Sequence, residues 1–279
     1  MKIYDCFMYF DEEIVLDLRL NSLNEFVDYF VIVESRYFHN GLERNLNFNI
    51  NEYPKFKDKI IYIIHENKPK GLKKINPEDD EELKTFKLNF NAHTLENDQR
   101  NDIFKGVKNS ESNDMILISD VDEIPNLENL NDISKYKYTA FKQKNFTYKF
   151  NLMNKTFPYW YGTKMCKKKH LKNPQWLRKQ KVKRFSLIRF FKINWNIIDN
   201  GGWHFTFLMK PDEIQNKIKS YAHAEFNIDE FTNLKNIEKK IRNNEDIFGR
   251  NQYYEKIEID KTYPDYIKNN FNKLKDWIL

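Results

Sequence analysis

Three carboxylates stand close together where an apolar run of the sequence ends. In ILISDVDEIP (116–125), Asp120, Asp122 and Glu123 follow apolar or small residues, and Pro125 closes the segment. Two aspartates one residue apart beyond a strand can each offer an oxygen to one hard divalent cation, with diphosphate oxygens and water completing its shell. Without a cation, such neighbouring carboxylates repel one another. The pattern predicts an Mg²⁺ or Mn²⁺ site with Asp120 and Asp122 as ligands.

Two later motifs fit a site that binds a metal and a diphosphate. In DNGGWHF (199–205), the glycine pair ending at Gly202 permits close backbone approach to a ligand, while Trp203 offers an aromatic face for a sugar. His204 offers an imidazole to the metal, although a histidine in this setting is also compatible with a satisfied core residue. KSYAHAEF (219–226) contributes His223 and Glu225 as a second pair for metal binding or acid–base chemistry.

Short apolar runs alternate with helical patterns through the first 120 residues. We expect strands at 3–10, 29–34, 59–66 and 114–120, and helices at 12–28 and 80–108. Continuously apolar strands separated by helices predict a parallel sheet with helices on both faces. Ligands bind beyond the carboxyl ends of such strands, where Glu34, Glu66 and Asp120 would meet.

The long helix is expected to place one arginine on its apolar stripe. Arg100 follows Phe86, Phe90 and His93 at helical spacing, whereas Asp98 points away. An arginine that faces inward needs an anion. Two interpretations remain open, a structural salt bridge to a strand-end acid or a contact with the diphosphate or base of a ligand.

The pattern changes after Pro125. Residues 138–152 alternate apolar and polar side chains, as a half-solvated antiparallel strand does, and 184–191 and 195–208 continue this character. From Lys210 onward the pattern is helical, with Ile214, Ile218 and Tyr221 on one stripe. We expect one α/β domain over 1–279, in which 1–125 binds a nucleotide and 126–279 binds the second substrate. Its mostly parallel sheet would be joined by a smaller antiparallel β region and C-terminal helices.

Composition and charge limit the classes of protein. Two cysteines exclude a disulfide framework, and we find neither a signal peptide nor an apolar run long enough to cross a membrane, so we expect a cytoplasmic protein. The net charge is +6, and ten Lys or Arg with no acid lie between Lys164 and Arg184. This segment is either a solvated basic loop or a patch for a phosphate-bearing or membrane-surface partner, in which Trp176 stacks on a sugar or base.

An ordered set of motifs resembles glycosyltransferase family 17, over about residues 1–230. The set comprises DCFMYFDEEIVLDLRLNSLNEFVDYFVIVES, the short loop HNG, NDQRNDIFKGV, DMILISDVDEIP, GGWHFTFL and SYAHAEF. The resemblance implies a Rossmann-like fold of the GT-A type. It also implies a metal-dependent nucleotide-sugar donor, usually a UDP-sugar, and inversion at the anomeric carbon. N-acetylglucosamine is the sugar that the family favours.

The resemblance also implies roles for individual residues. Asp120 would lie near the donor ribose and the metal, and Asp122 would be the main metal ligand. Glu123 would support the loop or meet the donor sugar, Arg100 would hold the donor, and Glu34 would lie near its base.

From the C-terminal half, His204 is the first choice for a metal ligand and His223 the second, with Gly202 and Trp203 beside the donor. An acceptor hydroxyl attacks as the diphosphate departs, so a carboxylate must take its proton. We assign this base role to Asp199, with Glu225 as the alternative.

The acceptor is expected to differ from that of the eukaryotic relatives. Those proteins carry a membrane anchor and a lumenal stem, whereas this chain starts directly on the first strand, which favours a surface glycan or a lipid-linked glycan as acceptor. Two other functions are compatible with parts of the sequence. A haloacid dehalogenase-like phosphatase also has D-x-D after a strand, and the basic segment would suit a binder of nucleic acid or anionic membranes.

Overall fold

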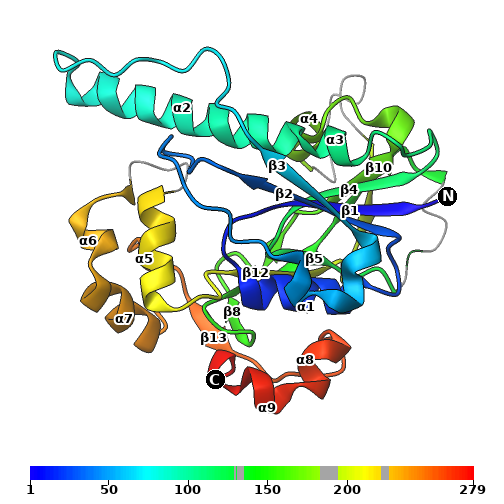
Figure 1. Cartoon of the computed structure of the whole chain (residues 1–279). Coiled ribbons are helices and arrows are strands. Elements are labelled where there is room, and N and C mark those ends of the chain that lie inside the picture. The colour runs from blue at the N-terminus through cyan, green and yellow to red at the C-terminus, as the bar shows by residue number, and fades with distance from the viewer. Residues whose placement is uncertain (129, 131–134, 183–193, 221–225) are drawn as a thin grey trace.

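The strands of the computed structural model form two sheets (Figure 1). The structure describes residues 1–128, 130, 135–182, 194–220 and 226–279. The first sheet has seven strands in the order β11-β6-β10-β4-β1-β2-β3. They are β1 (Ile3–Tyr9), β2 (Tyr29–Ser35), β3 (Ile60–His65), β4 (Met115–Asp120), β6 (Tyr138–Phe141), β10 (Lys164–Lys167) and β11 (Trp195–Ile198). Strands β1 to β4 are parallel to one another, and β11 is parallel to β6. Strand β10 runs antiparallel to β4 and β6, so the sheet is mostly parallel, as expected.

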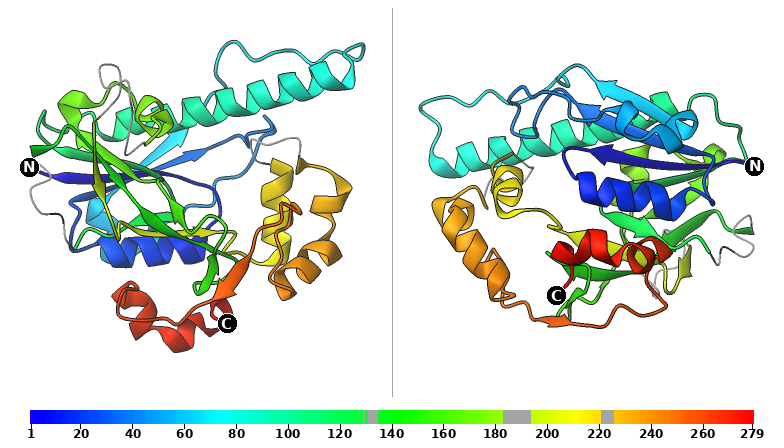
Figure 2. Two further views of the ribbon diagram at one scale, coloured as in Figure 1. Left: turned by 180° about the vertical axis from the view of Figure 1, so that it is seen from behind. Right: turned by 60° about the horizontal axis from the view of Figure 1, so that its bottom comes forward.

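Helices cover both faces of this sheet because its strands are apolar on both sides. They are α1 (Glu13–Leu23) on one face and α2 (Glu81–Asn101), α3 (Ile103–Gly106) and α4 (Pro174–Lys179) on the other (Figures 1 and 2). Within β1, Phe7 joins the buried cluster under α1, whereas Cys6 joins the cluster with α3 and α4. Successive side chains of this strand therefore point to opposite faces of the sheet and pack into two different hydrophobic cores.

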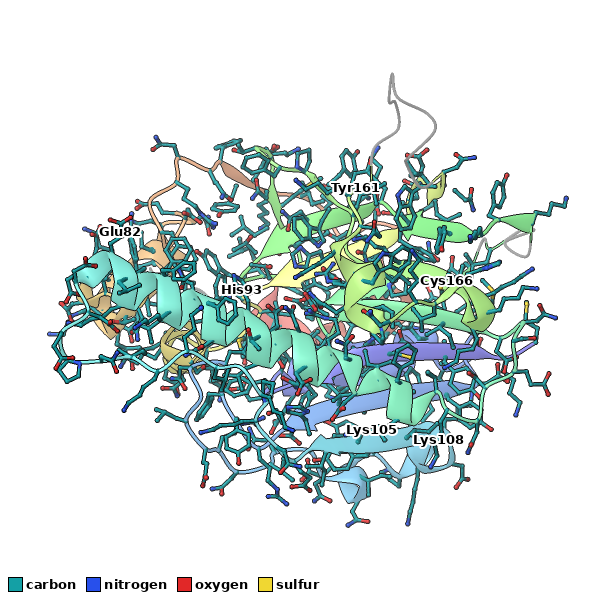
Figure 3. All side chains as sticks on the ribbon, turned by 90° about the horizontal axis from the view of Figure 1, so that it is seen from above. Glu82, His93, Lys105, Lys108, Tyr161 and Cys166 are labelled. Atoms are coloured by element: carbon teal, nitrogen blue, oxygen red, sulfur yellow. The ribbon has the colours of Figure 1, made fainter. Side chains whose placement is uncertain are left out.

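The helix expected at 80–108 is broken, and its first half has no sheet beneath it. It divides at Asp102 into α2 and α3. Phe86 and Phe90 are 55% and 39% exposed, so the expected apolar stripe is buried only in the second half, where Arg100 lies. Figure 3 shows the Glu82 end of α2 beyond the strands and the Lys105 end of the segment over them.

The second sheet combines residues from both predicted halves of the chain. It consists of β5 (Glu123–Pro125), β7 (Gln143–Thr147), β8 (Leu152–Asn154), β9 (Tyr159–Trp160), β12 (Gly202–Thr206) and β13 (Tyr254–Lys256). It is mainly antiparallel, but β12 runs parallel to β7. The single strand expected at 138–152 is instead split, with β6 in the first sheet and β7 in the second. The strand expected at 184–191 lies outside the described residues.

The remaining helices follow β12. They are α5 (Pro211–Ser220), α6 (Asp229–Thr232), α7 (Leu234–Arg242), α8 (Asp265–Asn269) and α9 (Phe271–Leu274). Elsewhere in the chain, 3₁₀ turns lie at Ile50–Glu52, Pro54–Lys59 and Lys168–His170, and another follows α9 at Lys275–Trp277. Ile214 and Ile218 of α5 are buried as expected, and Tyr221 lies outside the described residues. Helices α5 to α7 gather on one side, and α8 and α9 lie below α1 (Figure 2). Across the described part of the chain, every helix is too short or too polar to cross a membrane.

Candidate functional site

A cavity of about 850 Å³ opens at the carboxyl ends of β1, β2 and β4 and continues along the second sheet. Its wall includes Phe10 after β1, Ser35 at the end of β2, Asp120 at the end of β4 and His204 on β12. Sheet order reverses at β1, because β2 lies on one side of it and β4 on the other. Ligands of open α/β sheets bind at such a switch point.

A buried arginine shapes the turn that carries the three acids. Arg19 of α1 is fully buried and binds the Asp5 carboxylate through Nε and Nη2, at 2.7 and 2.6 Å. Its Nη1 donates to the backbone carbonyl oxygens of Asp120, Val121 and Glu123, at 2.9 to 3.1 Å. Sequence reasoning missed this residue, although an arginine inside the apolar run EEIVLDLRL was the same signal that singled out Arg100.

Two arginines form salt bridges with the carboxylate of Asp120. Nη2 of Arg100 lies 3.0 Å from Oδ1, and Nη2 of Arg178 lies 2.5 Å from Oδ2. Burial alone would raise the pKa of Asp120, but the charges of Arg178 and Arg100 outweigh burial and hold this pKa well below its usual range. The structure therefore agrees with the first interpretation of Arg100, a structural salt bridge to a strand-end acid.

Glu123 connects the acidic turn to its surroundings. Its side chain is 1% exposed, and Oε2 accepts a hydrogen bond from the backbone N–H of Asp120 at 2.9 Å. Oε1 accepts from Trp160 Nε1 at 2.6 Å and from Arg178 Nη2 at 2.7 Å. With these contacts, Glu123 supports the loop.

Asp122 and His204 face one another across the pairing of β5 and β12. In that pairing His204 lies opposite Glu123, and Nε2 of the imidazole is 3.7 Å from Oδ2 of Asp122. Thr206 Oγ1 lies 3.0 Å from the same nitrogen. Nδ1 of His204 is buried and has no hydrogen-bond partner among the described residues. Burial lowers the pKa of His204, but the charge of Asp122 outweighs burial and raises it overall.

The family model of glycosyltransferase family 17 matches residues 1–257 of this chain. The chain belongs to glycosyltransferase family 17. It is therefore a glycosyltransferase, an enzyme that moves a sugar from a donor to an acceptor, and this membership favours a transferase over the phosphatase and over the dedicated binder of nucleic acid or membranes. No curated protein matches the chain.

The family 17 site fits a cation only if the ligand supplies part of the shell. The described residues contain no group of three or more His, Cys, Asp or Glu side chains placed to hold a metal. Because Asp120 is engaged by two arginines, Asp122 and His204 are the pair that remains, and their 3.7 Å separation is below twice a metal–ligand bond of about 2.1 Å. Mg²⁺ sites often use one or two side chains with substrate phosphates and water. His223 lies outside the described residues.

Two strand-end acids do not reach the cavity of this family 17 enzyme. Glu34 is fully buried and accepts hydrogen bonds from Arg44, Tyr62 and the backbone N–H groups of residues 47 and 48, at 2.7 to 3.0 Å. Glu66 is half-exposed and pairs with Arg36. The expectation that these acids gather with Asp120 is wrong, because Glu34 anchors a loop and Glu66 turns to solvent.

The expected roles of Gly202 and Trp203 also change. Gly202 has φ +120°, and a Cβ there would come within 2.1 Å of the Ile124 carbonyl oxygen, so this glycine permits β12 to approach β5. Trp203 is 6% exposed and packs in the core. The tryptophan at the cavity is Trp160, whose ring stacks on His204 with centroids 5.4 Å apart.

The carboxylate assigned first to the base role lies apart from the site. Asp199 follows β11, its side chain is 61% exposed, and Oδ1 is 3.4 Å from Nζ of Lys142. It is not among the described residues that line the cavity. The alternative, Glu225, lies outside the described residues, although Ser220 and Phe226 on either side of that segment line the cavity.

The basic segment is neither wholly a solvated loop nor wholly a surface patch. Lys164 is 4% exposed and Arg178 binds Asp120, so two of its cations point inward. Trp176 packs against Tyr138, with centroids 5.7 Å apart, in place of a sugar or base. Exposed lysines such as Lys169 remain for contact with a membrane surface, which stays a prediction.

Proposed function

We propose that this enzyme transfers a sugar from a UDP-sugar to a hydroxyl of a glycan or a lipid-linked glycan, with inversion and with Mn²⁺ or Mg²⁺ bound. N-acetylglucosamine is proposed as the sugar by analogy with the family. The observation that carries the proposal is that Asp122 and His204, 3.7 Å apart, both line a cavity that extends from the switch point of the first sheet to the second sheet. A donor and an acceptor can meet there from opposite ends, as the GT-A arrangement requires.

The end of the cavity near β1 and β2 suits the nucleotide. Phe10 and Phe38 contact edge to face with centroids 5.5 Å apart, and the Arg44 guanidinium lies 4.4 Å from the Phe10 ring centre. All three residues line the cavity. Aromatic rings and guanidinium groups are surfaces on which nucleic-acid bases stack.

The part of the cavity around Asp122 and His204 suits the diphosphate. Asp122 and His204 would hold the cation, which neutralises charge on the leaving diphosphate when bound. Lys217 of α5 also lines the cavity, with Nζ 2.9 Å from Glu12 Oε1. Burial lowers its pKa, but the charges of Glu12 and Asp122 outweigh burial and keep this lysine protonated. Lys217 therefore supplies a fixed positive charge next to the proposed cation site.

Inversion requires a base at the acceptor hydroxyl. Of the two carboxylates that the sequence offers, we retain Glu225, because Asp199 is exposed and lies apart from the cavity. Glu225→Gln should lower transfer while UDP binding stays near that of the wild type.

The test is nucleotide release from UDP-, GDP- and CMP-sugars, with Mn²⁺ or with a chelator, by the wild type and Asp122→Asn. Metal-dependent release of UDP from one sugar, lost in the variant, is the expected result and names the donor. If no nucleotide is released and none binds in a metal-dependent way, the proposal is wrong.

A further inference from the structure

Three exposed aromatic side chains line the end of the cavity that belongs to the second sheet. Phe157, Tyr159 and Trp160 are 59%, 48% and 42% exposed, and we call them the aromatic shelf. Tyr159 and Trp160 form β9, which pairs with β7, and Phe157 directly precedes this strand across Pro158. Exposed apolar groups gathered in this way mark a surface that binds another molecule.

The aromatic shelf is held firmly in place. Trp160 donates its indole N–H to Glu123 and stacks on His204. The backbone N–H of Phe157 donates to Asn154 Oδ1 at 2.8 Å, and its carbonyl oxygen accepts from Asn145 Nδ2 at 3.0 Å. A surface that is ordered before binding loses little conformational freedom when a ligand arrives.

Planar polar side chains line the same cavity beside the shelf. Asn154 Nδ2 lies 2.6 Å from Gln252 Oε1, and Arg250 Nη2 lies 2.7 Å from Asp246 Oδ1. Amide, carboxylate and guanidinium groups have several donor or acceptor positions each, so these pairs can also bind hydroxyl groups. A pyranose ring matches this wall, because it has an apolar C–H face and a rim of hydroxyls.

We propose that the aromatic shelf is the subsite for the acceptor carbohydrate and that it binds the C–H face of a pyranose ring. The position of the shelf within the cavity indicates that it binds the acceptor and not the donor. Trp160 stacks on His204, whose Nε2 is 3.7 Å from Asp122, so a sugar on the shelf lies next to the proposed cation site. The nucleotide has its own aromatic surface at Phe10 and Phe38, at the other end of the cavity. The assignment rests on the proposed transferase function.

The experiment measures glycoside binding separately from nucleotide binding. Methyl β-glycosides of glucose, galactose, mannose and N-acetylglucosamine are titrated by saturation-transfer NMR, without nucleotide and then with UDP and Mn²⁺. The variant carries Phe157→Ala with Tyr159→Ala, and Phe271→Ala, which removes an aromatic side chain that is 51% exposed on α9, is the matched control. We expect at least one glycoside to bind the wild type and the control and to bind the double variant about tenfold more weakly or worse, with UDP binding unchanged.

Three results would overturn the shelf assignment. The first is that the double variant and the control bind the glycoside equally well. The second is that no glycoside binds to the wild type. The third is that the double variant also loses its affinity for UDP. Failure of the transferase function itself is seen elsewhere, as absent nucleotide release by the wild type. The two failures are therefore distinguishable.

Discussion

Nη2 of Arg178 lies 2.5 Å from Oδ2 of Asp120, although 58 positions of sequence separate the two residues. The same nitrogen is 2.7 Å from Glu123 Oε1, and Nη1 donates to the Gly162 carbonyl oxygen at 3.0 Å. Helix α4 is thereby attached to the acidic turn. A residue from a segment that looks like a basic surface patch in the sequence is in fact part of the site.

Arg178→Met should lower the free energy of unfolding by about 3 kcal/mol, because Glu123 and one oxygen of Asp120 lose a charged partner. Urea denaturation measures the change. The neighbouring Lys179 is exposed, so Lys179→Met should stay within about 0.5 kcal/mol of the wild type. Equal losses in the two variants would contradict the structural role of Arg178.

Arg19→Lys should lower stability by about 2 to 4 kcal/mol even though the charge is kept. An ammonium group cannot reproduce the fork that binds Asp5 and three backbone carbonyl oxygens at once. Nucleotide release should fall as well, because the backbone of the acidic turn loses its support. The matched control is Arg36→Lys, whose pair with Glu66 is about half-exposed and should matter by less than about 0.5 kcal/mol.

Asp199→Asn should leave turnover close to that of the wild type. Loss of a true general base costs roughly 10²- to 10⁴-fold. The carboxylate of Asp199 is exposed and paired with Lys142, and Asp199 is not among the described cavity residues. Steady-state transfer rates decide the question, and a fall of several hundredfold would return Asp199 to the base role.

Lys164 should make stability depend on pH above neutrality. Burial lowers the pKa of Lys164 to about 8 in the folded protein, whereas its unfolded pKa is about 10.4. Below pH 8 the charge is buried in the folded state at full cost. Between pH 8 and about 10.4 the unfolded chain binds more protons, so the free energy of unfolding rises with pH.

Urea denaturation of the wild type and Lys164→Met at pH 7 and pH 10 isolates this contribution. The difference between the two proteins should move by about 2 kcal/mol in favour of the wild type at the higher pH. A difference that is the same at both pH values would show that Lys164 keeps an ordinary pKa.

His204→Gln should raise the Mn²⁺ concentration needed for half-maximal nucleotide release by about tenfold or more, because Asp122 loses its partner in the proposed cation site. The measurement is a Mn²⁺ titration at a saturating UDP-sugar concentration. Asn145, which lines the cavity on the paired strand β7, gives the comparison variant Asn145→Ala, for which the Mn²⁺ midpoint should not move. An unchanged midpoint in His204→Gln would remove the imidazole from the cation site.

Much of the first sheet and the centre of the site could be predicted from local pattern. Continuous apolar runs identified β1 to β4, and an inward-facing arginine identified the partner of Asp120. The sequence suggested His204 and Asp122 as ligands of one metal, but it could not show that they lie side by side, because their proximity depends on the pairing of β5 with β12. Glu34 was misplaced because its position at a strand end says nothing about Arg44 and Tyr62, which bind it from elsewhere in the sequence.

The contributions of Arg178 and Trp160 could not be predicted because they arise from long-range contacts. Arg178 reads as one of ten cations in a basic segment, and only the packing of α4 against β4 turns it inward. Trp160 lies on a two-residue strand with no periodic signal, and Trp203 had the more suggestive neighbours in sequence. Local sequence shows which residue types are present, whereas the choice between two tryptophans depends on which strand faces the cavity.

Strands of the two sheets alternate along the chain, and this order has a consequence for synthesis on the ribosome. Strand β4 ends at Asp120, but β10, which pairs with it, begins only at Lys164. Likewise β5 ends at Pro125, but its partner β12 begins only at Gly202. Until those residues emerge, one edge of an apolar parallel sheet has unpaired backbone groups, which is a template for aggregation in the nascent chain. The acidic turn therefore stays open until β12 has been made, and co-translational chaperones can act on this edge of the nascent chain.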